Sequence, residues 1–153
     1  MTTMKNQGEI EFVTVTVGPQ LFGVAIDRVH DVFAADRITR VPMAPGEIAG
    51  ILNLRGRIVT AIDMRRRLGL PPRTDDKPSM AVGIELNGES YGLLIDSVGE
   101  VMKLGDDTRE SNPVNLDTRL ARVSGGVHRL EGQLMVILDV DHVLNNNTES
   151  MAA

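Results

Sequence analysis

The chain lacks cysteine and tryptophan altogether, and only 3% of its 153 residues are aromatic. The absence of cysteine excludes disulfide bonds, thiolate metal sites and a cysteine nucleophile, and it is typical of a reducing compartment. The few aromatic residues leave little surface on which nucleic-acid bases could stack. The formal net charge of −5 also argues against a nucleic-acid binder, because contacts with phosphates supply much of the affinity for nucleic acids.

Long apolar runs are absent as well. No segment approaches the length of a membrane span, and residues 1–10 lack the apolar core of a signal peptide. We therefore expect a cytoplasmic protein without direct membrane insertion. The length and a hydrophobic content of 42% suit one soluble domain, or two very small ones that share a core. We expect a single folded domain over residues 12–144, with flexible tails over residues 1–9 and 145–153.

The polar residues form no pattern that supports catalysis. His30, His128 and His142 show no pair at helical spacing, so a zinc site is not expected. The sequence has neither the Gly-x-Ser-x-Gly elbow of a hydrolase nor a glycine-rich loop for phosphates. We therefore predict a protein that is not an enzyme and that has no catalytic residues, no metal ion and no cofactor.

Short apolar segments separated by turn residues predict a series of β-hairpins. Residues 12–17 alternate strictly between apolar and polar, and Gly18-Pro19 separates them from a second apolar segment. Asn87-Gly88 is a strong signal for a two-residue turn between residues 80–86 and 90–95. A last hairpin is expected around Glu131-Gly132.

The segment Gly50–Asp63 is the most distinctive part of the chain. Two arms rich in Val, Ile and Leu flank an Arg55-Gly56 corner. Gly56 can adopt the positive φ that a tight turn requires, so the arms are expected to fold back on each other. This places Arg55 and Arg57 at or near an exposed corner of an apolar sheet.

Helical turns are expected between the hairpins. Ile26, Val29, Val32 and Phe33 have the spacing of one side of a short helix that Asp27 would cap. Asp63 suits the cap of a turn over residues 64–68, and Asp139 precedes a short C-terminal helix that ends near Leu144. We expect an equivalent turn over residues 97–102 and a long surface loop over residues 105–118.

The two halves of the chain, about residues 12–70 and 80–144, repeat one another. Phe22-Gly23-Val24 aligns with Tyr91-Gly92-Leu93, and the hairpin Gly50–Asp63 aligns with Gly126–Asp139. Neither half is long enough to bury much apolar surface alone, so we expect two small barrels with a shared core and a groove at their seam. The corners differ in charge, because Arg55 aligns with Glu131.

Two features have a structural and a functional interpretation. The basic stretch Arg55–Arg67 is either a set of solvated side chains or the patch of a small-barrel nucleic-acid-binding protein. The apolar residues Val29 and Val32 either lie in the core or line the seam together with Val98 and Val101. A groove of that kind would accept an apolar helix of a partner.

The motifs together resemble the CheW family of chemotaxis coupling proteins, whose module is also the regulatory domain of the CheA histidine kinase. The resemblance covers residues 12–144 and rests on these segments: Phe22-Gly23-Val24, Ile26, Val29, Asp31-Val32, Ile38-Thr39, Val41-Pro42, Pro45, Gly50-Ile51-Leu52-Asn53-Leu54-Arg55-Gly56 and Ile58-Val59. Two positions depart from the family pattern. Asp31 stands where glutamate is frequent, and Thr60-Ala61 lacks the proline that is frequent there.

The resemblance implies a mostly β fold of two intertwined SH3-like five-stranded barrels with short helical turns and a short C-terminal helix. It also implies a non-catalytic adaptor that couples chemoreceptor signalling tips to the regulatory domain of CheA, in arrays at the inner membrane. The free protein is expected to be monomeric. On matching positions, the resemblance assigns binding of the receptor or kinase to Val29, Asp31, Val32, Gly50, Arg55, Gly56, Val98 and Val101.

Overall fold

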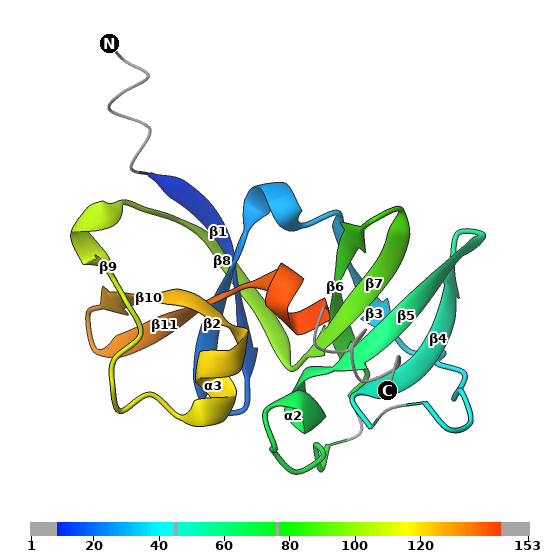
Figure 1. Ribbon diagram of the computed structural model, residues 1–153. Coiled ribbons are helices and arrows are strands. Elements are labelled where there is room, and N and C mark those ends of the chain that lie inside the picture. The colour runs from blue at the N-terminus through cyan, green and yellow to red at the C-terminus, as the bar shows by residue number, and fades with distance from the viewer. Residues whose placement is uncertain (1–8, 45, 76, 145–153) are drawn as a thin grey trace.

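A computed structural model describes residues 9–44, 46–75 and 77–144, and it consists of two curled β-sheets that lie side by side (Figure 1). The six-stranded sheet has the order β8-β1-β2-β11-β10-β9, and the five-stranded sheet has the order β3-β6-β7-β5-β4. The strands are β1 (Ile10–Val17), β2 (Gln20–Ala25), β3 (Asp31–Ala35), β4 (Ile48–Leu54), β5 (Arg57–Asp63), β6 (Ser79–Leu86), β7 (Glu89–Ile95), β8 (Ser97–Leu104), β9 (Arg109–Glu110), β10 (Ser124–Leu130) and β11 (Gln133–Leu138).

Each half of the sequence contributes strands to both sheets. The edge strand β3 pairs with β6 of the second half, and the edge strand β8 pairs with β1 of the first half. The hairpins then join in parallel, because β5 lies beside β7 and β11 lies beside β2. The expected pair of intertwined SH3-like barrels is therefore confirmed, and neither barrel consists of one sequence half. One sheet has a sixth strand, β9, beyond the five that were expected, because the loop over residues 105–118 adds a short strand beside β10.

The hydrophobic core also crosses from one sheet to the other. One buried cluster contains Val15 and Phe22 of the six-stranded sheet together with Ile62 and Leu93 of the five-stranded sheet. A smaller cluster around Val59 and Ala81 lies within the five-stranded sheet. Because the larger cluster is shared, separating the barrels would expose apolar side chains of both, which opposes their independent folding.

The structure corrects two expected helical turns. Only the 3₁₀ turn η1 (Ile26–Arg28) follows β2, whereas residues 31–35 form strand β3. Residues 97–102 belong to strand β8 instead of a helix. Short apolar runs have no reliable period, and pairing with a strand of the other half decides their conformation.

The other turns agree better with the sequence. Asp63 caps α2 (Met64–Arg67) as expected, and residues 140–144 are helical. The expected loop over residues 105–118 contains the 3₁₀ turn η2 (Asp106–Thr108) and the short strand β9. The helix α3 (Thr118–Val123), capped by Asp117, was not expected from the sequence. The predicted tails lie outside the described residues, except for the exposed Glu9.

Candidate functional site

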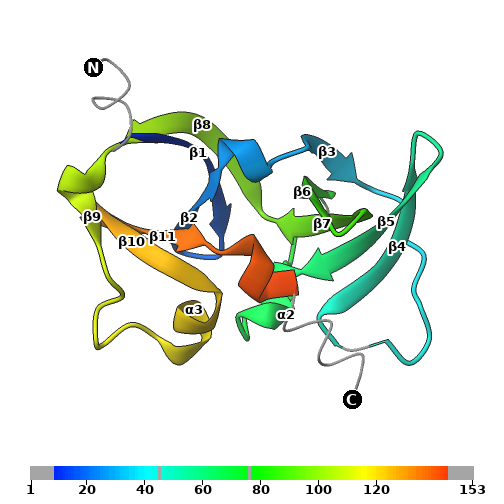
Figure 2. The same ribbon diagram turned by 45° about the horizontal axis from the view of Figure 1, so that its top comes forward.

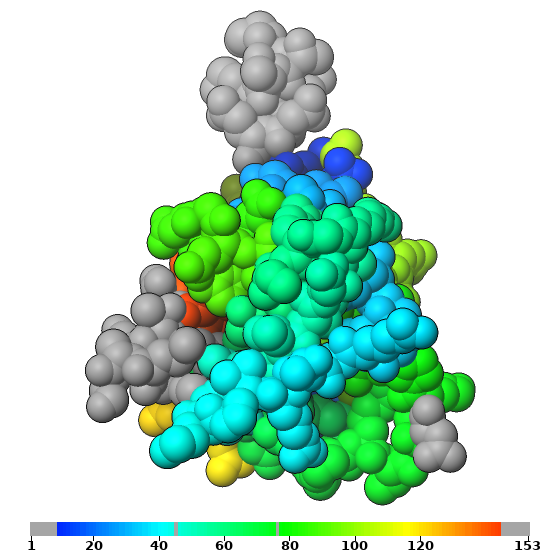
Figure 3. Space-filling view, turned by 90° about the vertical axis from the view of Figure 1, so that its right-hand side faces the viewer, coloured from blue at the N-terminus to red at the C-terminus, as the bar shows by residue number. Residues whose placement is uncertain are grey.

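The corner of the β4–β5 hairpin has the geometry that the sequence predicts. Arg55 and Gly56 have φ values of 54° and 83°, which is the pattern of a type I′ turn. The side chain of Asn53 accepts a hydrogen bond from the Gly56 amide at 2.9 Å and supports the turn. Figure 3 shows the turquoise hairpin and the cyan residues before it on the surface that faces the viewer.

Arg55 is fully available at this corner. Its residue is exposed, and no hydrogen bond or ion pair joins its side chain to the described part of the chain. Asparagine and glycine tolerate a positive φ better than arginine does, so the turn itself does not explain an arginine here. Glu131, at the corresponding corner of β10–β11, is also exposed, and among the described residues other than glycine only Met43, Arg55 and Asn87 have a positive φ.

Arg57, two residues further along, connects the hairpin to β3 and β6. Its guanidinium lies 3.3 Å from a carboxylate oxygen of Glu85 and 3.9 Å from one of Asp31. A third contact of 3.1 Å joins it to Nε2 of His30. Asp31 is therefore part of a charged cluster, and its Oδ1 atom is buried without a hydrogen bond from the described residues.

The four valines assigned from the resemblance lie on or beside the two exchanged edge strands. Val29 and Val98 are half-buried and pack against the shared core. Val32 on β3 and Val101 on β8 keep 39% and 50% of their surface exposed, which is unusual for large apolar side chains. In Figure 2, β8, η1 and β3 follow one another along the upper rim of the molecule. Each barrel thus presents one edge strand with an exposed valine.

The two assigned glycines have different surroundings. Gly50 is buried with a φ of 151°, and a Cβ atom added to it would lie 2.2 Å from the carbonyl oxygen of Thr39. The close passage of the Thr39 backbone therefore requires glycine at position 50, irrespective of any partner. Gly56 is exposed, and nothing lies within 4 Å of a Cβ atom added there.

The structure does not gather the eight assigned residues into one patch. Arg55 and Gly56 form the hairpin tip at one end of the five-stranded sheet, far from β8 in both ribbon views (Figures 1 and 2). Asp31 and Val32 lie between them on β3, and the pair of Arg57 with Asp31 connects the tip to that strand. The candidate site is therefore an extended surface with a charged end and an apolar end.

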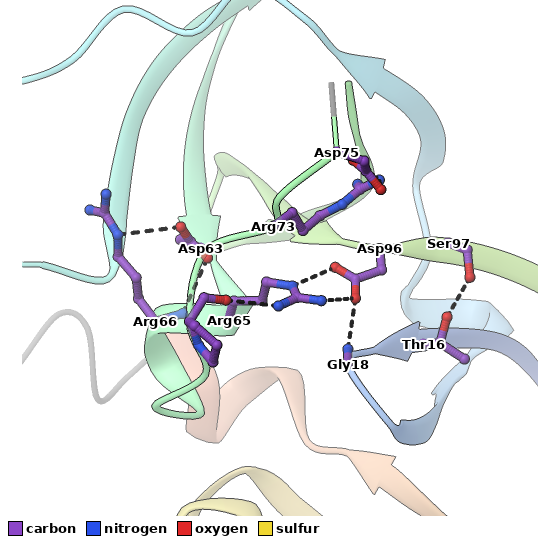
Figure 4. Close-up of polar contacts among 10 residues, drawn as sticks. Thr16, Gly18, Asp63, Arg65, Arg66, Arg73, Asp75, Asp96 and Ser97 are labelled. Atoms are coloured by element: carbon purple, nitrogen blue, oxygen red, sulfur yellow. Dashed lines mark hydrogen bonds and ion pairs between the residues drawn. The ribbon is translucent and has the colours of Figure 1, made fainter. Parts of the chain in front are cut away.

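The basic stretch that suggested nucleic-acid binding is divided by the fold. Arg65 on α2 forms a bidentate pair with Asp96 at 2.7 and 2.9 Å, and its third nitrogen donates to the Pro71 carbonyl (Figure 4). Arg66 lies 3.4 Å from Asp63. These side chains have local partners, so together with Arg55 they do not form a continuous basic patch.

Arg67 is the third arginine of this stretch with a local partner. Only 9% of its side chain is exposed, and it lies 3.8 Å from Glu47. Burial lowers its pKa, and the like charge of Arg122 acts in the same direction, whereas Glu47 opposes them. The stretch predicted as a solvated turn is thus solvated only in part.

Asp96 is the polar centre of the junction between the barrels. Besides Arg65, it accepts a hydrogen bond from the Gly18 amide at 2.7 Å, and its own amide donates to the Thr16 carbonyl at 2.9 Å. The hydroxyls of Thr16 and Ser97 also form a hydrogen bond beside it (Figure 4). The bonds from Arg65 and Gly18 hold the pKa of Asp96 below its ordinary value.

Sequence reasoning missed Glu85 and Asp96 as members of these clusters. Their partners are distant in sequence and come together only through the pairing of β3 with β6 and of β5 with β7. Asp96 follows Tyr91-Gly92-Leu93 at the same spacing as Asp27 follows Phe22-Gly23-Val24, and this alignment in the internal repeat was the one available signal. It indicated a special position but not its partner.

The described residues contain no group of three or more His, Asp or Glu side chains that could hold a metal ion. His128 is buried against Phe12 and contacts Thr108, and His142 lies 3.4 Å from Asp139. None of the helices in the described segments is both long and apolar enough to cross a bilayer. Arg55 and the partly exposed Val32 and Val101 are accessible on the described surface.

Comparison with known proteins gives the family. The sequence model of the CheW-like domain family matches residues 11–148 of this chain. The chain belongs to the CheW-like domain family. It is 27% identical over 151 residues to a probable chemotaxis protein CheW of Rhizobium etli, covering 97% of this chain and 95% of that protein. It is 25% identical to the chemotaxis protein CheW of Thermotoga maritima, over 92% and 91% of the two chains.

A solved structure supports the same assignment. The scaffolding protein TtCheW from Thermoanaerobacter tengcongensis superimposes with a TM-score of 0.75 and 30% sequence identity, over 84% of this chain and 83% of that one. Because the match covers 84% of this chain, it includes residues of both barrels. These comparisons assign this CheW-like chain to the chemotaxis scaffold and adaptor class.

Proposed function

We propose that this CheW-like protein is a non-catalytic adaptor that couples the cytoplasmic signalling tips of chemoreceptors to the CheA histidine kinase. Family membership and the fold of a scaffolding protein support the proposal. Membership of the scaffold and adaptor class does not by itself supply a contact with a partner. The observation that supports such a contact is Arg55, an exposed arginine at the tip of a turn with no partner among the described residues. A cation without a local partner is suited to a bidentate pair with a carboxylate of another protein.

The seam between the edge strands is the second element of the proposal. We assign the receptor's helical hairpin to the surface that carries Val29, Val32, Val98 and Val101. An amphipathic helix would cover the exposed surface of Val32 and Val101 while the half-buried pair forms the floor. Asp31 and Arg57 would provide polar contacts at the rim, as in other protein interfaces.

The proposal extends to location and oligomeric state. The free protein is a cytoplasmic monomer, and it joins receptor arrays at the inner membrane only through its partners. The nucleic-acid alternative is less favourable, because Arg65, Arg66 and Arg67 have carboxylate partners within the fold. A gel shift with a steep dependence on salt would revive that alternative.

The test is reconstitution with receptor-containing membranes and purified CheA. The wild-type protein should co-sediment with both and stimulate autophosphorylation of the kinase. Arg55→Glu should reduce assembly about tenfold or more, since a charge-assisted hydrogen bond contributes roughly 1.5–3 kcal/mol and tenfold corresponds to about 1.4 kcal/mol.

Glu131→Arg is the matched control, because it reverses the charge at the corresponding corner of the other barrel. It should leave assembly within about twofold of the wild-type value, and both variants should keep the circular dichroism of the parent. Wild-type protein that binds neither receptor nor kinase would refute the adaptor. Equal effects of the two charge reversals would refute the assignment of Arg55.

A further inference from the structure

A polar hollow of about 400 Å³ lies beside β9 and the beginning of β10. Its lining residues are Arg109, Glu110, Ser111, Asn112, Ser124, Gly125 and Gly126. Figure 2 shows the chain after β9 turning outward on this side of β10 before it reaches α3. The hollow is in the six-stranded sheet, whereas the hairpin corner of Arg55 is in the five-stranded sheet.

The internal repeat supplies a comparison for every part of this hollow. Glu110 pairs with Val127 on β10 as Thr39 pairs with Ile51 on β4. Arg109 therefore corresponds to Ile38, and Asn112 corresponds to Val41. Ser124 pairs with Leu138 as Ile48 pairs with Ile62, so Ser124 corresponds to Ile48.

In the five-stranded sheet the positions of Arg109, Asn112 and Ser124 are apolar, whereas those of Glu110 and Ser111 are Thr39 and Arg40. Cγ2 of Ile38 lies 2.7 Å from the point where a Cβ atom of Gly50 would be, so an isoleucine fills the space above the glycine. In the six-stranded sheet, Arg109 occupies the same place, with two guanidinium nitrogens 3.5 and 3.6 Å from a Cβ atom built on Gly126. A fold that needed only packing here would be served by the apolar set that the other sheet uses.

The polar groups of the hollow present mainly hydrogen-bond donors. One nitrogen of Arg109 donates to the Gly125 carbonyl at 3.0 Å, and no other contact occupies its guanidinium within the described chain. Oγ of Ser124 lies 2.6 Å from Oδ1 of Asn112 and 2.9 Å from the Gly126 carbonyl oxygen, and its single hydrogen can be donated to either acceptor. The side-chain amide of Asn112 donates no hydrogen bond within the described chain. The carboxylate of Glu110 is neutralised by a bidentate pair with Arg129 at 2.8 and 3.1 Å.

We propose that this hollow binds an oxyanion, held by the guanidinium of Arg109 and the side-chain amide of Asn112. The unused N–H groups of these two side chains need hydrogen-bond acceptors. A carboxylate or a phosphate supplies acceptor oxygens, and the planar guanidinium can bind either group. The oxyanion comes from a free anion or from an acidic side chain of a partner protein. The site is separate from the adaptor surface, and its test does not depend on that function.

The buried ring of His128 provides a reporter inside the protein. Burial lowers its pKa, and the positive charge of Arg109 lowers it further. An oxyanion bound at Arg109 would oppose the second effect, so saturation should raise the pKa of His128. The ring's NMR signals, followed as a function of pH, measure this change.

The experiment is an NMR titration of the ¹⁵N-labelled full chain with inorganic phosphate in one arm and N-acetyl-glutamate amide in the other. The amides of Ser111, Asn112, Ser124, Gly125 and Gly126 should shift saturably, with a dissociation constant on the order of 1 mM. Saturation by phosphate alone identifies a free anion as the source, and saturation by the glutamate derivative identifies an acidic side chain. Absence of saturable shifts in both arms would overturn the proposal.

Arg109→Ile introduces the residue found at the corresponding position of the five-stranded sheet, and it should weaken oxyanion binding at least tenfold. Arg122→Leu is the matched control, because it removes an exposed arginine of α3 that does not line the hollow and is not the partner of Glu110, and it should leave the shifts in place. Asn112→Val gives a second variant if Arg109→Ile fails to fold. Equal binding by wild type and by the folded Arg109 or Asn112 variant would contradict the proposal.

Discussion

Each barrel has one ion pair at a corresponding junction of the fold. The cation and the anion exchange places between the two junctions. Arg65 lies two residues after Asp63, at the end of one hairpin, and pairs with Asp96 after β7. Asp141 lies two residues after Asp139, at the end of the other hairpin, and pairs with Arg28 in η1 at 2.9 Å. Each pair lies just beyond the end of a parallel strand pair, where backbone hydrogen bonds stop.

This comparison separates geometry from chemistry. The repeated fold requires a connection at the end of β5–β7 and of β11–β2, but it does not prescribe which side carries the cation. Burial distinguishes the pairs further, since Arg65 and Asp96 are 22% and 19% exposed whereas Arg28 and Asp141 are 32% and 50% exposed. Positions that keep their chemistry in both halves, such as Gly50 and Gly126, are the ones that the backbone itself constrains.

The largest difference between the halves is expected at these two glycines. Gly50→Ala should cost about 3 kcal/mol or more of the free energy of unfolding, because its Cβ would lie 2.2 Å from a backbone oxygen and its φ is 151°. Gly126→Ala should cost only about 1–2 kcal/mol, since its nearest contact would be 3.3 Å at a φ of 120°. Equilibrium unfolding in urea measures both values, and equal losses would contradict the argument.

The next largest effect is expected at the junction. Asp96→Asn should cost about 2 kcal/mol, because it removes the counter-charge of the half-buried Arg65 guanidinium and replaces one of the two carboxylate oxygens that accept its hydrogen bonds. Asp141→Asn should cost only about 0.5 kcal/mol, because its pair is largely solvated. Urea unfolding at pH 7 gives both numbers, and a larger loss at Asp141 would reverse the ranking of the two junctions.

The dependence on pH checks the cause of the Asp96 effect. The pKa of Asp96 is lower in the folded protein than its ordinary value, so the unfolded state takes up a proton first as the pH falls. The stabilisation is therefore fully present above about pH 5, and it is lost as the pH falls below about 4 and through the folded pKa. The difference between wild type and Asp96→Asn should shrink at pH 3, and a constant difference would point to packing instead of charge.

The smallest effect is expected at the hairpin corners. Arg55→Asn should raise the free energy of unfolding by about 0.5 kcal/mol, because asparagine adopts a φ near 54° more readily than arginine. Glu131→Asn should not be stabilising, since Glu131 does not have a positive φ in the described chain. Thermal unfolding distinguishes the two, and a destabilised Arg55→Asn would mean that the arginine contributes to the fold.

Much of the fold followed from local patterns. Strict alternation located β1, Asn87-Gly88 located the β6–β7 turn, and Asp63 located α2, because each depends on interactions within a few residues. The conformation of residues 31–35 could not be obtained in this way. Their apolar residues suit a helix or a strand equally, and the edge of β6 makes them a strand.

The residues of the candidate site also separate into those that local patterns predict and those that only strand pairing brings together. The corner of Arg55 was evident because a tight turn exposes its side chains. The internal repeat offered the four valines as candidates for the seam, and the resemblance assigned them to binding. The contacts of Arg57 with Glu85 and of Arg65 with Asp96 depend on strands from different halves of the chain. No periodicity relates these residues, so no local pattern could have paired them.

The sequence by itself determined that the chain is duplicated, rich in short strands and turned at particular glycines. A duplication is visible when the two halves are compared, and turn chemistry depends only on neighbouring residues. Only the tertiary structure decided that β3 and β8 are exchanged between the halves. Each edge strand finds its hydrogen-bond partner in the other half, and burial of the shared core stabilises that arrangement. The exchange positions the valines of the seam, the arginine of the corner and the two junctions of opposite polarity.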